Sequence, residues 1–358
     1  MSRTLADAHG SRVATLLAGS WRRLPPPLQM SAEALDEITP GVVRMKTGAL
    51  GWWRVRDSAL RTSAAGDRLR DAYHLHGFQA VYHARDLSRI VGCLREAGVA
   101  PVLVKGPAIA RLYPERGLRP FGDLDLCVRP DQHASAVAVV DKCAGEFAPV
   151  DLHAGFAELQ ARSWDDVYAR TEVVRFSGID VRVLSPEDHL RFLCLHQLRH
   201  GIQTPLWLCD IAVAVESRPR TFDWDLALGP DRRRADWVAC TIGLAHQLFG
   251  AQVDDTPVAD RAARLPEWLV PSVLERWGHQ CAANFEPPEL VPDTWRLLAR
   301  APQSVRLYWP SPVAATVHLR RPFSNFPRMP IQVVDAFARL ARFSLRRLLG
   351  KQPDFDQH

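Results

Sequence analysis

Apolar residues recur with helical spacing over residues 32–94 and again after Ser185. The clearest N-terminal stretch is 86–98, where one apolar stripe is followed by a glycine that acts as a stop signal. The members of this stripe are Leu87, Ile90, Val91 and Leu94. Ser185 precedes a proline and two acidic residues, which is typical of a helix start. The pattern therefore predicts two further helices, over about 186–200 and 205–217.

Between these helical stretches lies a region of short apolar runs separated by polar turns. The runs are rich in Val, Leu and Ile and are bounded by Gly, Pro and Asp, which is typical of strands. Strands are predicted at 99–105, 123–128 and 148–156, and a hairpin at 172–185 with its turn near Ser177 and Gly178. Helices are predicted from Pro107 onward and over 130–144.

This order of elements predicts an α/β (α+β) fold in which a small sheet lies between helical segments. We expect a mainly helical N-terminal segment, a core that holds the strands, a helical domain and a basic C-terminal region. The predicted boundaries are 1–84, 85–185, 186–290 and 291–358. Proline-rich stretches near 216–230 and 284–293 are predicted to be loops.

The composition indicates a globular protein without a secretory or membrane signal. Of the 358 residues, 47% are apolar and 24% are charged, which is typical of soluble domains. The seven cysteines include no C-x-x-C pair, which predicts reduced thiols in a cytoplasmic protein and no structural zinc. The N-terminus lacks the apolar stretch of a signal peptide. No apolar run approaches the roughly 18 residues of a membrane span.

Basic residues gather at the C-terminal end of the chain, although the formal net charge is only +5. From residue 296 onward, eleven Lys and Arg accompany three Asp, a balance of +8 that leaves −3 for the remainder. The helix predicted over 331–350 has an apolar stripe with arginines beside it. The stripe consists of Ile331, Val334, Phe337, Leu340, Ala341, Leu345 and Leu348. Such a helix packs on the protein body or lies at an anionic membrane surface. Arginines without clustered aromatic residues do not support sequence-specific nucleic-acid binding, which stays open as a partner class.

Two acidic residues inside an apolar run are the first indication of chemistry. Asp123 and Asp125 lie two apart in "DLDLCV", so a strand would place both carboxylates on one face. Neighbouring carboxylates repel each other unless a cation lies between them. Magnesium prefers oxygen ligands and leaves room for phosphate oxygens. The pair therefore predicts a metal-binding edge, although a lone Asp-x-Asp also occurs by chance or caps a loop.

A lysine and a glycine end the preceding strand. Gly106 allows backbone N–H groups to approach an anion, and the helix predicted from Pro107 favours phosphate at its start. Lys105 adds a positive charge. Lysine is scarce in this chain, which contains only Lys46, Lys105, Lys142 and Lys351 beside 41 arginines. Arg119, four residues before Asp123, either reaches a phosphate or is a solvated loop arginine.

A third acid would complete a two-metal site, in which one ion activates the attacking oxygen and the other steadies the triphosphate. Asp151 is the best candidate because it lies in a predicted strand, on the same face as His153. Asp141 is the competing acid, but its helical surroundings are typical of a solvated residue.

The stretch "VLVKGPAIARLYPERGLRPFGDLDLCV", residues 102–128, resembles the signature of an uncharacterised bacterial nucleotidyltransferase family in the polymerase-beta-like superfamily. That family combines an apolar strand ending in Leu-Lys-Gly, a helix with Tyr-Pro near its end, Arg-Pro, and Asp-Ile-Asp-Leu. A short acid-Leu-His strand follows, here "VDLH", and then two histidines four apart and a Trp-x-x-Asp segment, here "LCLHQLRH" and "WLCD". The motifs appear in order over about residues 85–215, which is more specific than any one of them alone.

The resemblance implies a small mixed polymerase-beta-like sheet with a metal-dependent nucleotidyl-transfer site. It implies that Asp123, Asp125 and Asp151 bind metal, with two Mg²⁺ ions expected, and that Lys105 and Gly106 hold the triphosphate of an NTP. An NMP would then pass to an acceptor hydroxyl or phosphate with release of pyrophosphate. The sequence identifies neither the acceptor, whether small molecule, peptide, protein or RNA end, nor the base of the nucleotide.

Two departures from the superfamily pattern are present, and the first of them favours an alternative function. Most members carry Gly-Ser rather than Lys-Gly at the first turn, and the interval from Gly106 to Asp123 is longer than usual. The alternative is a catalytically degenerate nucleotide- or partner-binding accessory protein in a biosynthetic or toxin–antitoxin pathway. A membrane-surface scaffold that uses the C-terminal helix is a third hypothesis.

Four further residues are candidates on the substrate side, namely His153, His196, His200 and Asp210. Histidines at i and i+4 share a helix face and could bind zinc, but "HQLRH" lacks the glutamate of an H-E-x-x-H motif. The pair therefore either helps the helical domain to pack beside the sheet through hydrogen bonds or places the acceptor.

Overall fold

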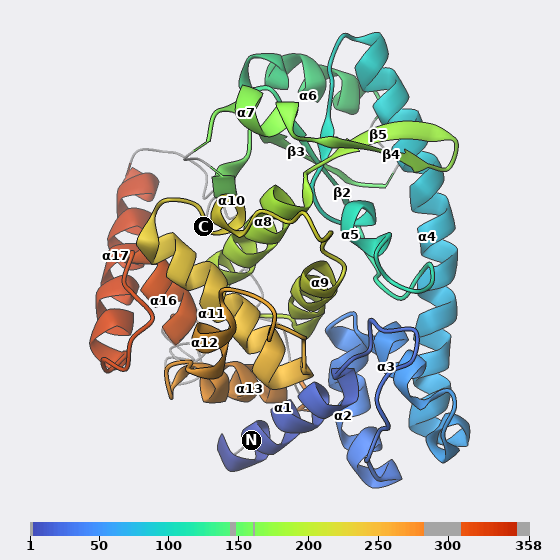
Figure 1. The fold of residues 1–358 in the computed structure, drawn as a ribbon, viewed down its shortest axis with the longest axis vertical. Helices are drawn as coiled ribbons and strands as arrows, with labels where there is room; N and C mark the ends of the chain where they lie inside the picture. The colour runs from blue at the N-terminus through green and yellow to red at the C-terminus, as the bar shows by residue number, and fades with distance from the viewer. Residues whose placement is uncertain (1–2, 144–147, 160–161, 283–308, 349–358) are drawn as a thin grey trace.

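The computed structural model describes residues 3–143, 148–159, 162–282 and 309–348. A mixed five-stranded sheet lies in the upper part of the molecule and helices surround it (Figure 1). This arrangement confirms the predicted fold class. The proline-rich stretch predicted at 284–293 lies outside the described residues, and so does the boundary at 290.

The sheet has the strand order β3-β2-β1-β5-β4. The strands are β1 (Val102–Leu103), β2 (Leu124–Val128), β3 (Val150–Ala154), β4 (Glu172–Phe176) and β5 (Ile179–Val183). β1 pairs with β2 in the antiparallel sense and with β5 in the parallel sense, while β2 and β3 run parallel. β4 and β5 form the predicted hairpin, and its turn residues Ser177 and Gly178 both have positive φ, 42° and 94°.

Helices form the rest of the described structure. The N-terminal helices are α1 (Arg3–Leu17), α2 (Ala32–Arg44), α3 (Gly48–Val55) and α4 (Ala64–Glu96). Those among and beside the strands are α5 (Pro107–Ala110), α6 (His133–Lys142) and α7 (Trp164–Ala169). Those that follow the sheet are α8 (Pro186–Arg199), α9 (Pro205–Glu216), α10 (Trp224–Leu228), α11 (Arg232–Phe249), α12 (Ala259–Ala263), α13 (Leu269–His279), α16 (Pro312–His318) and α17 (Met329–Leu348). Three short 3₁₀ turns lie at Ala59–Thr62, Pro130–Gln132 and Ala157–Leu159.

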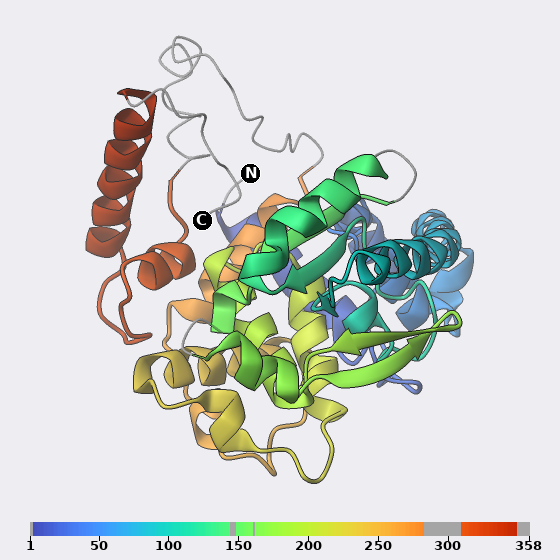
Figure 2. The same cartoon turned by 90° about the horizontal axis from the view of Figure 1, so that it is seen from above.

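Each face of the sheet is covered by a different set of side chains. The predicted stripe of α4 packs, together with α6, on the side chains of Leu124, Leu126 and Val128, and α4 and α6 lie next to each other in Figure 2. Cys127 instead contacts a cluster that includes Phe192 of α8. Because side chains alternate along a strand, Asp125 shares the face of Cys127 and is directed toward α8.

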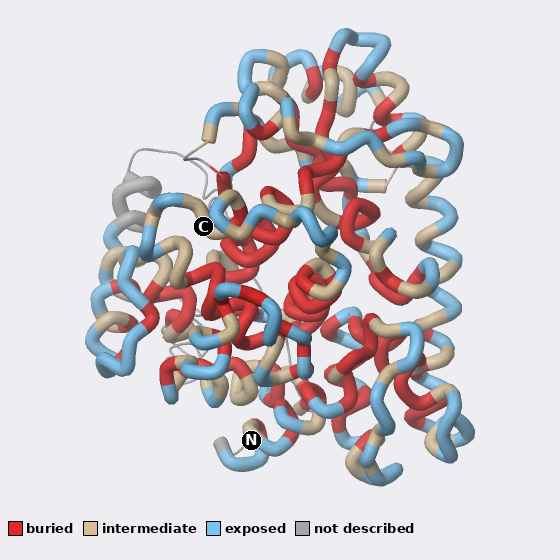
Figure 3. Tube along the Cα trace, viewed as in Figure 1, coloured by how far each residue is buried: buried red, intermediate tan, exposed pale blue. Residues whose placement is uncertain are grey.

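The N-terminal helices and the helices after the sheet share one hydrophobic core. Buried residues of α1, α2 and α3 belong to the same cluster as those of α8, α9, α11 and α13, and buried positions run through the lower half of the molecule in Figure 3. α4 extends from these N-terminal helices to the sheet along one edge of the molecule (Figure 1). The segments before and after the sheet therefore support it as one helical body.

α17 places part of its predicted apolar stripe toward solvent. Val334 and Phe337 are 55% and 68% exposed, whereas Asp335 is fully buried. The reason is electrostatic, because Asp335 pairs with Arg339 of α17 at 2.8 Å and with His318 of α16 at 3.4 Å. Of the two placements predicted for the stripe, packing on the protein body does not hold for these two residues. None of the described helices carries an apolar stretch long enough to cross a bilayer.

We predict that His189 on α8 makes stability depend on pH. Burial, followed by the charge of Arg111, lowers its pKa from 6.5 to about 3. Between pH 6.5 and 3 the unfolded chain therefore binds a proton that the folded protein does not. This contribution to stability is complete above pH 6.5 and is lost as the pH falls through that window. In His189→Gln, the free energy of unfolding should fall less steeply below pH 6 than in the wild type, by about 1.4 kcal/mol per pH unit. Urea titrations at pH 7, 6, 5 and 4 measure both slopes, and equal slopes would contradict the prediction.

Candidate active site

The register of β2 and β3 places two carboxylates side by side. Asp125 lies opposite Asp151, and Cys127 lies opposite His153. Since alternate residues of a strand share a face, Asp151 and His153 both lie next to Asp125. The side chains differ in exposure, because that of Asp125 is 4% exposed and that of Asp151 is 51% exposed. The structure thus brings one buried and one accessible carboxylate together at the edge strand.

Two cationic groups of the protein contact these carboxylates. Lys105 Nζ lies 2.5 Å from Asp125 Oδ1. His153 Nε2 lies 3.1 Å from Asp151 Oδ2 and 3.6 Å from Asp125 Oδ1. The sequence placed His153 on the substrate side, but the structure places it between the two acids.

The titration of these groups reflects their mutual attraction. Burial alone would raise the pKa of Asp125, but the adjacent imidazole of His153 and then the charge of Lys105 lower it to about 2. The carboxylates of Asp125 and then of Asp151 raise the pKa of His153 to about 9. At neutral pH the group is therefore two carboxylates balanced by an imidazolium and an ammonium.

Asp125, Asp151 and His153 have the chemistry and spacing of a metal site. Their potential ligand atoms all lie within 4.8 Å of one another, and no other such group of three occurs within the described residues. Two carboxylate oxygens suit a hard divalent cation such as Mg²⁺ or Mn²⁺. The imidazole adds a third donor once it has lost its proton.

Asp123 lies at the rim of this cluster. It precedes β2 rather than lying within it, its side chain is exposed, and it does not belong to the group of three. The position of Asp125 supports the prediction that it binds metal. For Asp123 metal binding stays a prediction.

The Lys105-Gly106 turn requires its glycine. Gly106 has φ 53° and ψ −116°, a conformation that side chains with a Cβ avoid. The turn packs against the loop before β2, since a Cβ at Gly106 would lie 3.5 Å from the carbonyl oxygen of Asp123 and from the ring of Phe121. α5, which follows, has a single turn. This part of the site therefore consists of Lys105 and the loop before β2. A single helical turn contributes little to it.

Arg119 is an anchor of the fold and not a free cation. Its side chain is 6% exposed, and its guanidinium binds the fully buried Asp210 of α9, with Nη2 at 2.8 Å from Oδ2 and Nε at 3.1 Å. The hydroxyl of Tyr113 donates to Oδ1 of the same carboxylate at 2.8 Å. The sequence predicts that Arg119 contacts the nucleotide and that Asp210 lies on the substrate side. In the structure the two side chains instead form an ion pair with each other. Tyr113, which belongs to the Tyr-Pro motif, was not predicted to take part.

His196 of α8 and His200, the residue that follows α8, lie near Lys105 of the cluster. His196 Nδ1 and Arg199 Nη2 both lie close to Glu158 Oε1, at 3.1 and 3.2 Å. The rings of His196 and His200 are 4.6 Å apart. Burial is the main cause that lowers the pKa of each histidine, and the charge of Lys105 contributes to both. Among the described residues neither histidine belongs to a three-ligand metal group, and Glu158, the partner of His196, was not predicted.

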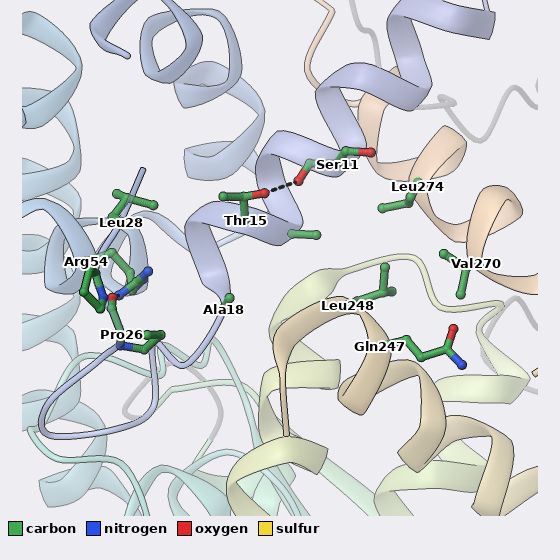
Figure 4. Close-up of a pocket in the computed structure, with 12 residues that line it drawn as sticks. Ser11, Thr15, Ala18, Pro26, Leu28, Arg54, Gln247, Leu248, Val270 and Leu274 are labelled. Carbon is green, nitrogen blue, oxygen red and sulfur yellow. Dashed lines mark hydrogen bonds between the residues drawn. The ribbon is translucent and has the colours of Figure 1, made fainter. Parts of the chain in front are cut away.

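A separate cavity of about 430 Å³ lies between α1, the loop that follows it, α11 and α13 (Figure 4). Ser11, Thr15, Leu248 and Val270 are among the residues that line it. The charged residue in its wall, Arg54, is bound to the carbonyl oxygens of the chain at residues 16 and 26. The cavity includes none of the candidate site residues.

A family model described as "Uncharacterised nucleotidyltransferase" matches the chain twice, over residues 31–145 and 141–250. The two matches extend over more than half of the 358 residues and include every candidate site residue. The chain belongs to this family. No curated protein and no solved structure matches the chain.

Membership of a nucleotidyltransferase family confirms the resemblance seen in the sequence and agrees with the mixed sheet. The family description points to transfer of a nucleotidyl group, and the Asp-Asp-His cluster lies within the matched residues.

We predict that Asp210→Ala strongly destabilises the protein. The substitution leaves Arg119 buried without its partner, a change that typically costs about 3–5 kcal/mol. Asp180→Ala is the matched control, because Asp180 forms an exposed pair with Arg175 at 3.0 Å and such pairs contribute about 0–1 kcal/mol. Urea unfolding of both variants and the wild type measures the difference. Equal losses in the two variants would show that the buried pair is not an anchor.

Proposed function

We propose that the protein is a metal-dependent nucleotidyltransferase that moves an NMP from an NTP to an acceptor hydroxyl or phosphate and releases pyrophosphate. The observation that carries this proposal is the pairing of Asp125 with Asp151 on adjacent parallel strands, beside the Lys105-Gly106 turn. Family membership supports the reaction class. The geometry supports the choice of residues.

Asp125 and Asp151 are the proposed metal ligands, and Asp123 completes the set at the open rim. A bound divalent ion supplies Lewis-acid stabilisation of charge on the phosphoryl oxygens. Asp125, held by the hydrogen-bonded sheet, orients the site. Asp151 faces the solvent side, from which an acceptor arrives.

Lys105 is proposed to exchange partners during the reaction. Its ammonium now neutralises Asp125 at 2.5 Å. A cation bound by Asp125 would replace this charge and leave Lys105 to hold the triphosphate, as a lysine does well because its charge is compact and its stem is flexible.

When the acceptor is a hydroxyl, the chemical step requires one proton to leave it. The acceptor oxygen forms a bond to the α-phosphorus, and the bond from that phosphorus to the oxygen bridging to the β-phosphate breaks, so that pyrophosphate leaves with the electron pair. Asp151 is the proposed proton acceptor because it is the accessible carboxylate of the pair.

His196, His200 and Glu158 are proposed to border the acceptor side. Both histidines lie near Lys105, and His196 Nδ1 lies 3.1 Å from Glu158 Oε1. Their chemistry suits a polar acceptor, but it does not select among a sugar phosphate, an antibiotic, a peptide, a protein or an RNA end.

The contact of Lys105 with Asp125 also favours the alternative function. A lysine that stays on Asp125 occupies the place of a metal ion, as in a protein that binds a nucleotide or partner without turnover. The two hypotheses predict different results in the following experiment.

Calorimetric titration of ATP, GTP, CTP and UTP, with and without Mg²⁺, tests the proposal. We predict magnesium-dependent binding of at least one NTP by the wild type. Asp125→Asn and Asp151→Asn should weaken it more than a hundredfold, since even outer-shell partners of a metal contribute roughly 10–100-fold. Asp141→Asn is the matched control, because Asp141 is an exposed acid on α6 and should bind as the wild type does.

Pyrophosphate release in the presence of an acceptor panel separates the two functions. Release by the wild type and not by Asp151→Asn supports the transferase. Binding that needs no magnesium and survives both site substitutions would favour the accessory protein. Circular dichroism of each variant establishes that the fold is retained, and Asp151→Asn keeps the test valid if Asp125→Asn does not fold.

A further inference from the structure

The turn after α2 contains a lysine in a conformation that favours glycine. Lys46 has φ 59°, in the left-handed region. Its N–H donates to the carbonyl of Val43, and the N–H of Thr47 donates to the carbonyl of Val42. These two hydrogen bonds define a Schellman motif, and its left-handed position is usually occupied by glycine. Lys46 therefore has a backbone conformation that is unfavourable for any residue with a side chain.

The side chain of Lys46 reaches the loop that precedes β2. Its Nζ lies 3.7 Å from the position that a Cβ would take at Gly122. It also lies close to His76 of α4, whose pKa is lowered to about 4 by burial and then by the charge of Lys46. Gly122 is the residue directly before Asp123, and the same loop packs against Gly106. Lys46 and Lys105 thus lie beside one loop.

No carboxylate of the described residues forms an ion pair with Lys46, and the side chain is exposed. Lys105, in contrast, contacts Asp125. Two of the four lysines in the chain therefore border this loop. The other basic residues of the chain include 41 arginines, so lysine is rare elsewhere. An exposed ammonium at the rim of a proposed phosphate site has the chemistry to bind phosphate oxygens.

Two contacts hold this arrangement in place. The hydroxyl of Thr204, at the start of α9, donates to the carbonyl oxygen of Met45 at 3.2 Å. α9 also carries Asp210, which anchors Arg119 and with it the loop before β2. One helix therefore positions both the turn that carries Lys46 and the loop that Lys46 reaches.

We propose that Lys46 binds the β- or γ-phosphate of the nucleoside triphosphate, so that the N-terminal helical segment contributes to the nucleotide site. This inference rests on the proposed function. Lys46 lies outside the strand-bearing core, directly after α2, and its ammonium would reach the triphosphate from the loop that precedes β2. The left-handed turn is the conformation that directs its ammonium to the loop.

Lys46→Gly separates the conformational role from the charge. Glycine should relieve the unfavourable conformation and raise Tm by roughly 1–3 °C. It should also weaken binding of the magnesium complexes of ATP, GTP, CTP or UTP by about tenfold or more, because a charge-assisted contact is lost. Binding of the corresponding monophosphates, which lack the outer phosphates, should change less than threefold. Lys46→Met should weaken NTP binding equally without raising Tm.

Arg320→Gly is the matched control. Arg320 occupies the same position of a Schellman motif after α16, has φ 51° and is exposed. Its replacement should raise Tm in the same way and leave NTP affinity unchanged. Differential scanning fluorimetry and calorimetry measure the two quantities for all four proteins.

The outcomes distinguish this inference from the proposed function. Wild-type protein that binds no NTP with Mg²⁺ would overturn both. Wild-type protein that binds an NTP, with Lys46→Gly and Lys46→Met binding equally well, would overturn the role of Lys46 and leave the nucleotidyltransferase proposal standing. Equal losses of NTP and NMP affinity would also overturn it, since they would place Lys46 away from the outer phosphates.

Discussion

The buried ion pair between Arg119 and Asp210 joins the sheet to the helical body. Both side chains are almost completely shielded from solvent, and Tyr113 donates a further hydrogen bond to the same carboxylate. A charge in such surroundings is tolerated only when it is paired. The loop between α5 and β2 is therefore held against α9. Gly117 of this loop also packs on Gly77 of α4, so closely that a Cβ would lie 2.7 Å from the backbone. The position of the loop relative to Lys105 and Asp125 depends on these contacts.

The carboxylates of the candidate site are neutralised by the protein itself. Lys105 and the imidazolium of His153 lie against Asp125 and Asp151. If these carboxylates bind a metal as proposed, binding would be an exchange, in which a proton and an ammonium group leave the carboxylates as the ion arrives. In the proposed function this exchange couples the two ligands, because the released ammonium becomes available to the triphosphate. An active enzyme would make this exchange. In an accessory protein without turnover, Lys105 would stay on Asp125.

Lysine and arginine take different parts in this molecule. Arginines form the fixed pairs, such as Arg119 with Asp210 and both Arg162 and Arg170 with the buried Asp188. The planar guanidinium suits such pairs because it donates several hydrogen bonds in a fixed geometry. The lysines at the site have compact charges on flexible stems, which allows a change of partner.

The sequence by itself determined several of the elements and the candidate carboxylates, because caps, glycine turns and periodicity act within a few residues. It correctly indicated the stripe of α4, the start of α8 at Ser185, the hairpin turn, the family, and Asp125 and Asp151 as strand residues. Only the tertiary structure decided which of these residues meet. It paired Arg119 with a carboxylate 91 positions away, left Asp123 outside the cluster, and turned Val334 and Phe337 outward. Such contacts depend on packing and burial between distant segments, and no local pattern contains that information.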